Sequence, residues 1–578
     1  MFSFSTNIFK KILSKRTLFF INLHDFFEIY NLAKFLIEIK KEFMKKLALL
    51  SVILILTTIF IPSSKAQTPL TEGGGAAIPK CSAPLSTPTL IRNNDKSALF
   101  YLETYSPNVK LQYQGLVTYN KTTGTAFEED IQLPEGYHHL YTRAIGTELF
   151  GYYYRYNAEK KSFDYSVARY PIKKNVDGVR VLTPENRLSV DLAGRGEILK
   201  YVAVSPDDSK YAMIFIVPND RNQAPYFYCY IYDNTGKEIW YDKFLPTIAG
   251  NKFSIQDIEL SDKGELLLLV YATKGKNATI QNPTVQLFSC THGNISSITE
   301  TLDFGFVNSM KMLRLANKDI FIGGYYDETQ QSNTTGYFTF VVKEDPLRIT
   351  EKSHAPFDKT QGNEYYGLSS SDYYVKCDYL FEMPDHIVAM IGEQYASIQQ
   401  HSDKSAMAYR HHTNDIFCNR FTLNGTDLGC IKVNRHASAQ ASEIVTTHDD
   451  GERIAAFRME EKTARPKAPT FYNLGLGYVP VVKGSEIFIL YTDLLSNYAE
   501  DSEEWNAAEI ETPDKNCLVV TRMDYSTDKK VIMLPNKAGQ TFHDVWLVDG
   551  EDIYFGMSGK KTYTIEKFKL NKKWSWDK

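Results

Sequence analysis

Most of the chain alternates between short polar turns and short hydrophobic runs. The clearest copy of this pattern is Val204–Ile216, VSPDDSKYAMIFI, in which an apolar run enters a Ser-Pro-Asp-Asp turn and continues as aromatic and branched residues. Short runs of Tyr, Phe, Val and Ile bounded by Asn, Asp, Gly and Pro are typical of β-strands. The pattern therefore predicts an all-β protein.

The turn followed by a hydrophobic strand recurs at intervals of roughly 50 to 67 residues, which is typical of an array of small sheets. Further copies begin at Asn93, Ala144, Leu260, Leu315, Met383, His448, Val481 and Leu547. The strands after the His448 and Val481 copies start only about 33 residues apart, too close for a four-stranded module. We therefore expect these two copies to belong to one elaborated module, which leaves eight modules, with seven as the alternative.

The second half of each module reads as another strand pair. Tyr226–Leu245 has an Asn-Thr-Gly turn between alternating apolar residues, and Asn414–Val433 has an Asn-Gly turn. Both turns are typical of β-hairpins, and two hairpins make a four-stranded antiparallel sheet. Sheets this small bury both faces only by stacking. The sequence therefore predicts a β-propeller of seven to eight four-stranded blades, with eight expected, whereas tandem β-sandwich domains are the alternative.

Three of the copies carry a resemblance to a known family. VSPDDSKYAMIF, LSDKGELLLLVYA and HDDGERIAAF resemble the blade motif of TolB-like propellers. The leader followed by degenerate blades is similar to uncharacterised secreted β-propeller proteins of Gram-negative bacteria. The resemblance covers residues 93–570 and implies a fold without implying a particular activity.

The N-terminal region has the organisation of an export signal. Met44–Lys46 is followed by fifteen uncharged residues, Leu47–Ile61, and then by Ser64 and Ala66 at the −3 and −1 positions of a cleavage site. This order is typical of a secretory signal peptide, and the apolar segment is shorter than the roughly 20 residues that span a bilayer. We expect residues 44–66 to be removed and the protein to be periplasmic, outer-membrane-associated or extracellular. Residues 1–43 are either an extension from a start codon placed too early or a genuine extended leader.

The remaining boundaries follow from composition. Residues 67–92 are rich in Pro, Gly and Thr and are predicted to form a linker or surface strap. The propeller is expected over 93–570, followed by a tail at 571–578. An acidic insertion near 496–516 interrupts the pattern, and Ser502 could cap a short helix in it. Such loops often carry function, although a solvated acidic loop is the other interpretation.

Removal of the leader makes the chain more acidic. Residues 67–578 carry 55 Lys and Arg against 65 Asp and Glu. Nucleic acids and anionic membranes bind clusters of Lys and Arg, so we expect neither as a partner. We also expect no membrane span in the mature chain.

The seven cysteines all lie after the leader, and export implies a compartment in which disulfides form. Cys418 and Cys430 flank a predicted hairpin turn. They could form a disulfide if the strand register brings them opposite each other. The alternative is that both are ordinary buried small residues.

Motifs that carry chemistry are absent or have another explanation. The chain contains no G-x-S-x-G, H-E-x-x-H, C-x-x-C or G-x-x-x-x-G-K-[ST]. Asp233–Trp240 approaches the sialidase repeat S-x-D-x-G-x-x-W, but the spacing is wrong and we interpret it as a hairpin turn with a packed Trp. His138-His139 and His411-His412 are adjacent pairs, and strand neighbours point to opposite faces. We therefore predict no metal site and no cofactor, and we assign no catalytic or ligand-binding residue.

The aromatic content of 13% fits more than one function. Exposed Tyr and Trp can stack on sugars, whereas blade strands also use aromatics for packing. Our first hypothesis is an exported non-enzymatic binding or assembly module for a protein or glycan partner in the cell envelope. The alternatives are a propeller enzyme acting on extracellular polysaccharide and a structural subunit of an outer-membrane complex. Polar residues converging from several blades would favour the enzyme, and an exposed aromatic patch would favour the binding module.

Overall fold

The protein is represented by a computed structural model in which the chain divides into two units, 1–64 and 65–578. All described residues belong to the second unit. They are 76–78, 86–93, 96–105, 111–131, 138–145, 148–157, 162–171, 187–191, 199–207, 209–217, 224–246, 248, 252–275, 280–329, 334–357, 374–400, 407–435, 437–443, 478–494, 508–509, 516–523, 531–535, 541–549, 552–558 and 563–569. Among these residues no helix is long and apolar enough to cross a bilayer.

The described residues form eight sheets, seven with four strands and one with six. The first sheet consists of β2 (Ser86–Asn93), β3 (Ser97–Tyr105), β4 (Leu111–Asn120) and β5 (Thr125–Asp130). The second consists of β6 (His138–Ile145), β7 (Glu148–Asn157), β8 (Ser162–Pro171) and β9 (Arg187–Asp191). The third sheet consists of β10 (Leu199–Val204), β11 (Lys210–Val217), β12 (Tyr226–Asp233) and β13 (Glu238–Phe244). The fourth consists of β14 (Lys252–Leu260), β15 (Leu266–Thr273), β16 (Thr284–Thr291) and β17 (Asn294–Thr301).

The second half of the chain continues in the same order. A four-stranded sheet of β18 (Phe306–Arg314), β19 (Ile320–Asp327), β20 (Gly336–Lys343) and β21 (Arg348–Pro356) comes first. The six-stranded sheet holds β22 (Tyr374–Glu382), β23 (Ile387–Gln400), β24 (Met407–Thr422), β25 (Asp427–Val433), β26 (Ala437–Glu443) and β29 (Ala508–Glu509). The seventh sheet consists of β27 (Tyr478–Lys483), β28 (Glu486–Leu494), β30 (Asn516–Arg522) and β31 (Val531–Pro535). The last sheet consists of β1 (Ala76–Ile78) together with β32 (Thr541–Asp549), β33 (Asp552–Ser558) and β34 (Tyr563–Lys569).

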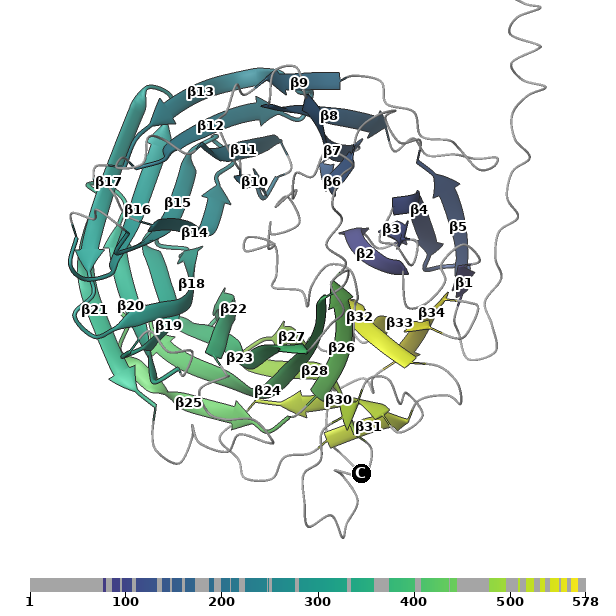
Figure 1. Ribbon diagram of the computed structural model, residues 1–578. Coiled ribbons are helices and arrows are strands. Elements are labelled where there is room, and N and C mark those ends of the chain that lie inside the picture. Colours follow the sequence, from purple (N-terminus) through teal and green to yellow (C-terminus); the bar gives the residue numbers. More distant parts are fainter. Residues whose placement is uncertain are drawn as a thin grey trace, which may run out of the picture. The chain divides into compact units, whose positions relative to one another are not determined.

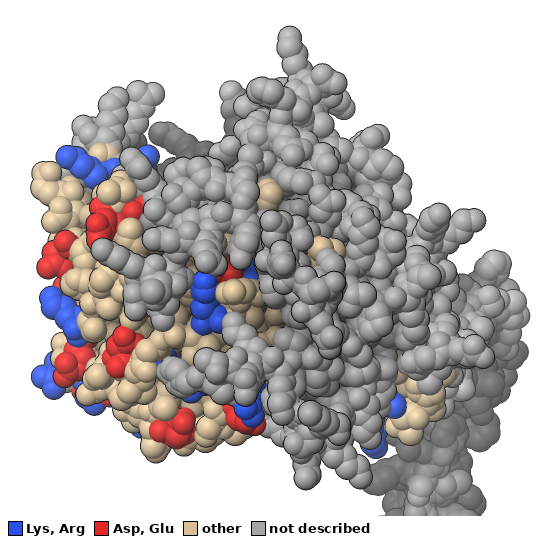
Figure 2. Space-filling view, turned by 90° about the horizontal axis from the view of Figure 1, so that it is seen from below, with Lys and Arg blue, Asp and Glu red and all other residues tan. Residues whose placement is uncertain are grey.

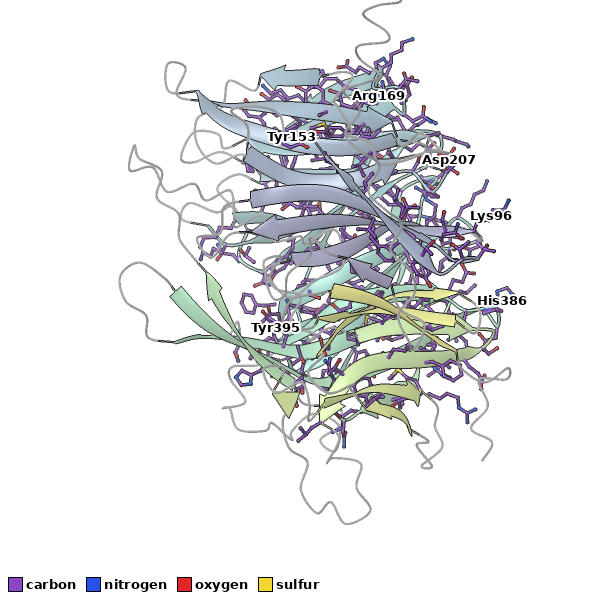
Figure 3. All side chains as sticks on the ribbon, turned by 90° about the vertical axis from the view of Figure 1, so that its right-hand side faces the viewer. Lys96, Tyr153, Arg169, Asp207, His386 and Tyr395 are labelled. Atoms are coloured by element: carbon purple, nitrogen blue, oxygen red, sulfur yellow. The ribbon has the colours of Figure 1, made fainter. Side chains whose placement is uncertain are left out.

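Each described copy of the repeated turn joins the first and second strands of one sheet. In the turn between β10 and β11, the Ser205 N–H donates to the Lys210 carbonyl at 3.0 Å, and equivalent bonds close the turns before β15, β19 and β23. Lys96, Asp207 and His386 lie in three of these turns and on the same side of the molecule (Figure 3). The repeat predicted from the sequence is therefore confirmed at the turns that the structure describes, which precede β11, β15, β19, β23 and β28. The copy at His448 lies outside the described residues, and the Val481 copy forms the first turn of its own sheet, β27–β31.

The sheets stack face to face through apolar side chains. Trp240 and Phe227 of one sheet meet Leu266 and Phe288 of the next in a continuous cluster, and similar clusters fill the following junctions up to β28. The first strands of successive sheets lie innermost and the last strands outermost around a central axis (Figure 1). This arrangement of small antiparallel sheets is a β-propeller, as the sequence predicted.

The closing sheet combines strands from both ends of the described chain. Strand β1 pairs antiparallel with β34, with Ala76 opposite Ile565, and becomes the outermost strand of the sheet β32–β34. The expected linker or strap at residues 67–92 therefore supplies β1 and most of β2, and the sheets begin before the expected position 93. The composition did not indicate these strands, because β1 has only three residues and Pro88 lies within β2.

One sheet carries an elaboration. Its strands β23 and β24 have 14 and 16 residues, whereas β15 and β16 have 8 each. The added length of the hairpin pairs with β26, and β26 pairs in parallel with β29. We call residues 395–400, 407–413 and 437–443 the arm. The predicted acidic insertion contributes β29 to it, whereas the helix expected at Ser502 lies outside the described residues.

Candidate functional site

An aromatic surface covers one face of the sheet β10–β13. Because side chains alternate along a strand, Phe227, Cys229 and Ile231 enter the core against the next sheet, and the tyrosines between them share the opposite face. The register places Tyr230 opposite Tyr241, and Tyr228 opposite Lys243. We call this surface the tyrosine face; its members are Tyr226, Tyr228, Tyr230, Ile239, Tyr241, Lys243 and Leu245.

The polar groups of the tyrosine face bind one another. The rings of Tyr230 and Tyr241 stack with centroids 4.6 Å apart, and their hydroxyls hydrogen-bond. The Lys243 Nζ lies 3.9 Å from the centroid of the Tyr226 ring and donates to the Tyr228 hydroxyl, which raises the pKa of Lys243. Burial, helped by the neighbouring Tyr241, raises the pKa of Tyr230 to about 12. Tyr230 therefore presents a neutral phenol at physiological pH, and Lys243 keeps its charge.

The outer strand β13 exposes apolar side chains. Ile239 is 43% exposed, Tyr241 39% and Leu245 42%. Among the described large hydrophobic residues, Leu428 on β25 is the only other one that is exposed to a similar extent. The outer strands β17 and β21 instead expose Ser, Thr, Glu and Lys. Acidic and basic side chains are interspersed over the described part of the face in Figure 2, without a broad block of either sign. Strand β13 thus differs from the outer strands β17 and β21, whose exposed side chains are polar.

A second cluster consists of buried charged groups between the sheets β22–β26 and β27–β31. Asp378 is the extra residue at a bulge of β22, and its Oδ2 accepts a hydrogen bond from the Tyr478 hydroxyl at 2.8 Å. Glu393 of β23 forms an ion pair with Arg435, whose side chain has no exposed surface. Burial raises the pKa of Asp378 to about 7 and that of Glu393 to about 8, the latter opposed by Arg435. Both acids can therefore exchange a proton near neutral pH.

These acids were not singled out by the sequence. A single Asp within the apolar run VKCDYLF is the only local signal for Asp378, and Arg435 follows β25 without any motif. The two acids lie on adjacent strands of one sheet, whereas Tyr478 comes from the next. Because Asp378 of β22 accepts a hydrogen bond from Tyr478 of β27, the cluster connects the two sheets.

The cysteine pair differs from the predicted disulfide. In the hairpin β24–β25, Cys418 lies opposite Ile431, and Cys430 lies opposite Asn419. This offset of one position sends the two side chains to opposite faces, and they do not form a disulfide. Cys418 packs in the cluster shared with β28, and Cys430 packs against the cluster shared with β19. Cys418 is therefore an ordinary buried residue, whereas Cys430 is half-buried.

The histidine pairs and the sialidase-like segment are also placed. His138 and His139 are adjacent in β6, and His411 and His412 are adjacent in β24. In the described part of the chain no three His, Cys, Asp or Glu side chains are placed to hold a metal ion.

Asp233 closes the turn of the sialidase-like segment by accepting from the Thr235 and Lys237 N–H groups at 2.9 and 3.0 Å. Trp240 is buried in the core and donates to the Gly264 carbonyl at 3.0 Å. The interpretation as a hairpin turn with a packed Trp is confirmed.

Comparisons with known proteins find only distant structural likenesses. No protein-family model matches the chain. No curated protein matches it either. Among solved structures, the β-propeller domain of the Trilobed protease from Pyrococcus furiosus is similar at 10% identity and a TM-score of 0.30, covering 76% of this chain and 98% of that domain.

Two further solved structures are also distantly similar to this chain. The WD40 domain of SCAP from fission yeast has 8% identity and a TM-score of 0.34, with 87% of this chain and 97% of that one covered. The polysaccharide lyase Uly1 has 12% identity and a TM-score of 0.31, with 75% and 90% covered. None of these likenesses bears on activity.

Proposed function

We propose that this chain is an exported, non-enzymatic binding or assembly module of the cell envelope that holds a protein partner on the tyrosine face. We further propose that its eight sheets are eight blades and that it is related to TolB-like propellers, a relation supported by the repeated turn motifs. One observation carries the proposal of binding. Ile239 and Tyr241 of the outer strand β13 and Leu245 just after it are exposed, whereas the outer strands β17 and β21 expose polar residues.

The geometry of β13 suits an extended segment of the partner. Strand β13 is the last strand of its sheet, so among the described strands nothing pairs with its outer edge. Ile239 is the extra residue at a bulge of β13, Tyr241 lies in the regular part of the strand, and Leu245 directly follows its end. A partner strand added at this edge would place alternate apolar side chains beside them, and cross-strand pairs of this kind stabilise a sheet. An exposed apolar edge is also one that proteins normally protect.

A protein fits this surface better than a glycan. The Tyr228 hydroxyl bonds Lys243 and the Tyr230 hydroxyl bonds Tyr241, so each has fewer positions left for a sugar hydroxyl. The rings of Tyr230 and Tyr241 also stack on each other. Ile239 and Leu245 offer no polar contact at all. Aliphatic side chains beside tyrosine are typical of protein interfaces.

A cross-linking experiment tests the proposal. A photoreactive residue at position 239 of the mature chain would be activated in cells, and captured species would be compared between wild type and the variant Y241S/L245S. Leu428→Ser is the matched control, because Leu428 is equally exposed at 42% on another outer strand. We expect one dominant protein adduct that Y241S/L245S reduces at least tenfold and Leu428→Ser leaves unchanged.

Two results would contradict this assignment. A capture pattern that the double variant does not change would remove the tyrosine face as the binding surface. Retardation of the purified protein in gels containing neutral polysaccharides, abolished by Y241S/L245S, would identify the partner as a glycan.

The polysaccharide enzyme is the second candidate because Asp378 and Glu393 titrate near neutral pH. We assign no catalytic role to either acid. Hydrolysis or cleavage of a polysaccharide panel by the wild-type protein, abolished by Asp378→Asn, would favour this alternative over the binding module.

A further inference from the structure

The tyrosine face has one charged member, Lys243. This residue is exposed and lies two positions from Tyr241 in the regular part of β13, the outermost strand of its sheet (Figure 1). Leu245 follows the end of the strand and is exposed on the other side of Lys243 along the chain. A partner that contacts both Tyr241 and Leu245 therefore also covers the Lys243 amine.

Neighbouring rings hold this amine in place. The Lys243 Nζ lies 3.9 Å from the centroid of the Tyr226 ring and 5.1 Å from that of the Tyr228 ring. It also donates a hydrogen bond to the Tyr228 hydroxyl. These contacts fix the position of the positive charge but do not neutralise it, because both rings are uncharged. An ammonium group has three N–H donors, and the bond to Tyr228 uses one of them.

No carboxylate among the described residues neutralises Lys243. None of the ion pairs between described residues includes it. The adjacent Asp242 lies opposite the core residue Cys229, on the other face of the sheet, and its Oδ1 accepts the Lys243 backbone N–H at 2.7 Å. By contrast, Lys352 on the outer strand β21 pairs with Glu300 at 2.9 Å. The charge of Lys243 is therefore left for a partner to neutralise.

The chemistry of the partner follows from the cost of covering this charge. An ammonium group that leaves water without an opposite charge beside it loses most of its hydration energy. A backbone carbonyl of the partner would accept a hydrogen bond from Lys243 but would leave a net charge at the interface. A carboxylate accepts the hydrogen bond and also neutralises the charge.

We propose that Lys243 selects the partner by binding an Asp or Glu carboxylate within an otherwise apolar, extended segment of the partner protein. Residues that face one side of a strand occur at every second position. An acid opposite Lys243 therefore has apolar residues two positions away on either side, beside Tyr241 and Leu245. The segment has the order apolar-x-acid-x-apolar. This inference rests on the proposed function, because it specifies the chemistry of the segment that the tyrosine face holds.

Selection from a displayed library of random nine-residue segments on the mature chain, residues 67–578, tests the proposal. We expect the enriched segments to have the order apolar-x-acid-x-apolar. Selection on Lys243→Glu should instead enrich Lys or Arg at the central position, because this variant reverses the charge. A synthetic peptide with an enriched segment should bind Lys243→Glu at least about tenfold more weakly than wild type.

Two further variants separate the charge from other effects. Arg348→Glu is the matched control, because Arg348 is an exposed cation on the outer strand β21 and the substitution changes the net charge equally. It should bind the peptide as wild type does. Lys243→Met keeps an unbranched apolar side chain and removes the charge. It should bind the peptide more weakly, and its binding should depend less on the NaCl concentration than that of wild type.

The outcomes distinguish this inference from the proposed function. Enriched segments that require Tyr241 and Leu245 but contain no acid would overturn the role of Lys243 and leave the tyrosine face as the binding surface. Equal binding of the peptide by wild type and Lys243→Glu would have the same meaning. No enrichment on wild type, or enrichment of the same segments on Y241S/L245S, would contradict both.

Discussion

Single side chains at the repeated turns close a turn and also join neighbouring sheets. The Asp207 Oδ1 accepts from the Ser205 hydroxyl at 2.7 Å and from the Ser209 N–H at 2.9 Å, and these bonds lower the pKa of Asp207. Its own N–H donates to the Asp262 carboxylate in the turn of the next sheet at 3.0 Å. Asp207 and Asp262 thus bind backbone groups of their own turn and of the neighbouring turn.

Trp240 gives a prediction at the scale of one residue. Replacement by Phe removes the donor to the buried Gly264 carbonyl and part of the ring that fills the junction between two sheets. We expect Trp240→Phe to lower the free energy of unfolding by about 2 kcal/mol. Urea unfolding of wild type and variant measures this, with the exposed Ile239→Val as the control. A loss of less than a few tenths of a kcal/mol would show that the indole contributes little.

Among the elements, β1 is the shortest contributor to a four-stranded sheet but connects distant parts of the chain. Its three residues pair with Ile565, Thr564 and Tyr563 of β34. Closure of a propeller protects the edges of its sheets, so an unpaired β34 would leave an open edge.

Truncation separates β1 from the residues before it. A mature chain that starts at residue 80 lacks β1, whereas one that starts at residue 76 keeps it. We expect the shorter chain to lose about 1–3 kcal/mol of stability and to be cleaved faster by trypsin near β34. The chain starting at residue 76 is the control and should match the full mature form. Equal stability of both truncated chains would mean that β1 does not hold the closing sheet.

At the scale of the whole molecule, the organisation is that of repeated sheets, two of which differ from the others. Strand β13 differs from the outer strands β17 and β21 by its exposed apolar side chains, and the sheet of β22 differs by its arm. A fold that grows by repetition can acquire a binding surface on one sheet without altering the packing of the others.

Export of the molecule is a further expectation. A chain that starts at Met44 should be exported as well as the full chain, and the intact mass of the product should correspond to an N-terminus at Gln67. Ala66→Leu places a large residue at the −1 position and should retain residues 44–66. Mass spectrometry of cell fractions distinguishes the forms. An uncleaved chain confined to the cytosol would contradict the expected signal peptide and the envelope function.

The sequence by itself determined the all-β class, the repeat and the turn chemistry. These depend on local contacts, because a turn such as Ser205–Lys210 closes over a few residues and strand alternation is visible in any short window. Only the tertiary structure decided the pairing of β1 with β34, the opposite faces of Cys418 and Cys430, and the meeting of Arg435 with Glu393 and Thr492. Such contacts depend on register and on which sheets become neighbours, and neither leaves a periodic trace in the chain.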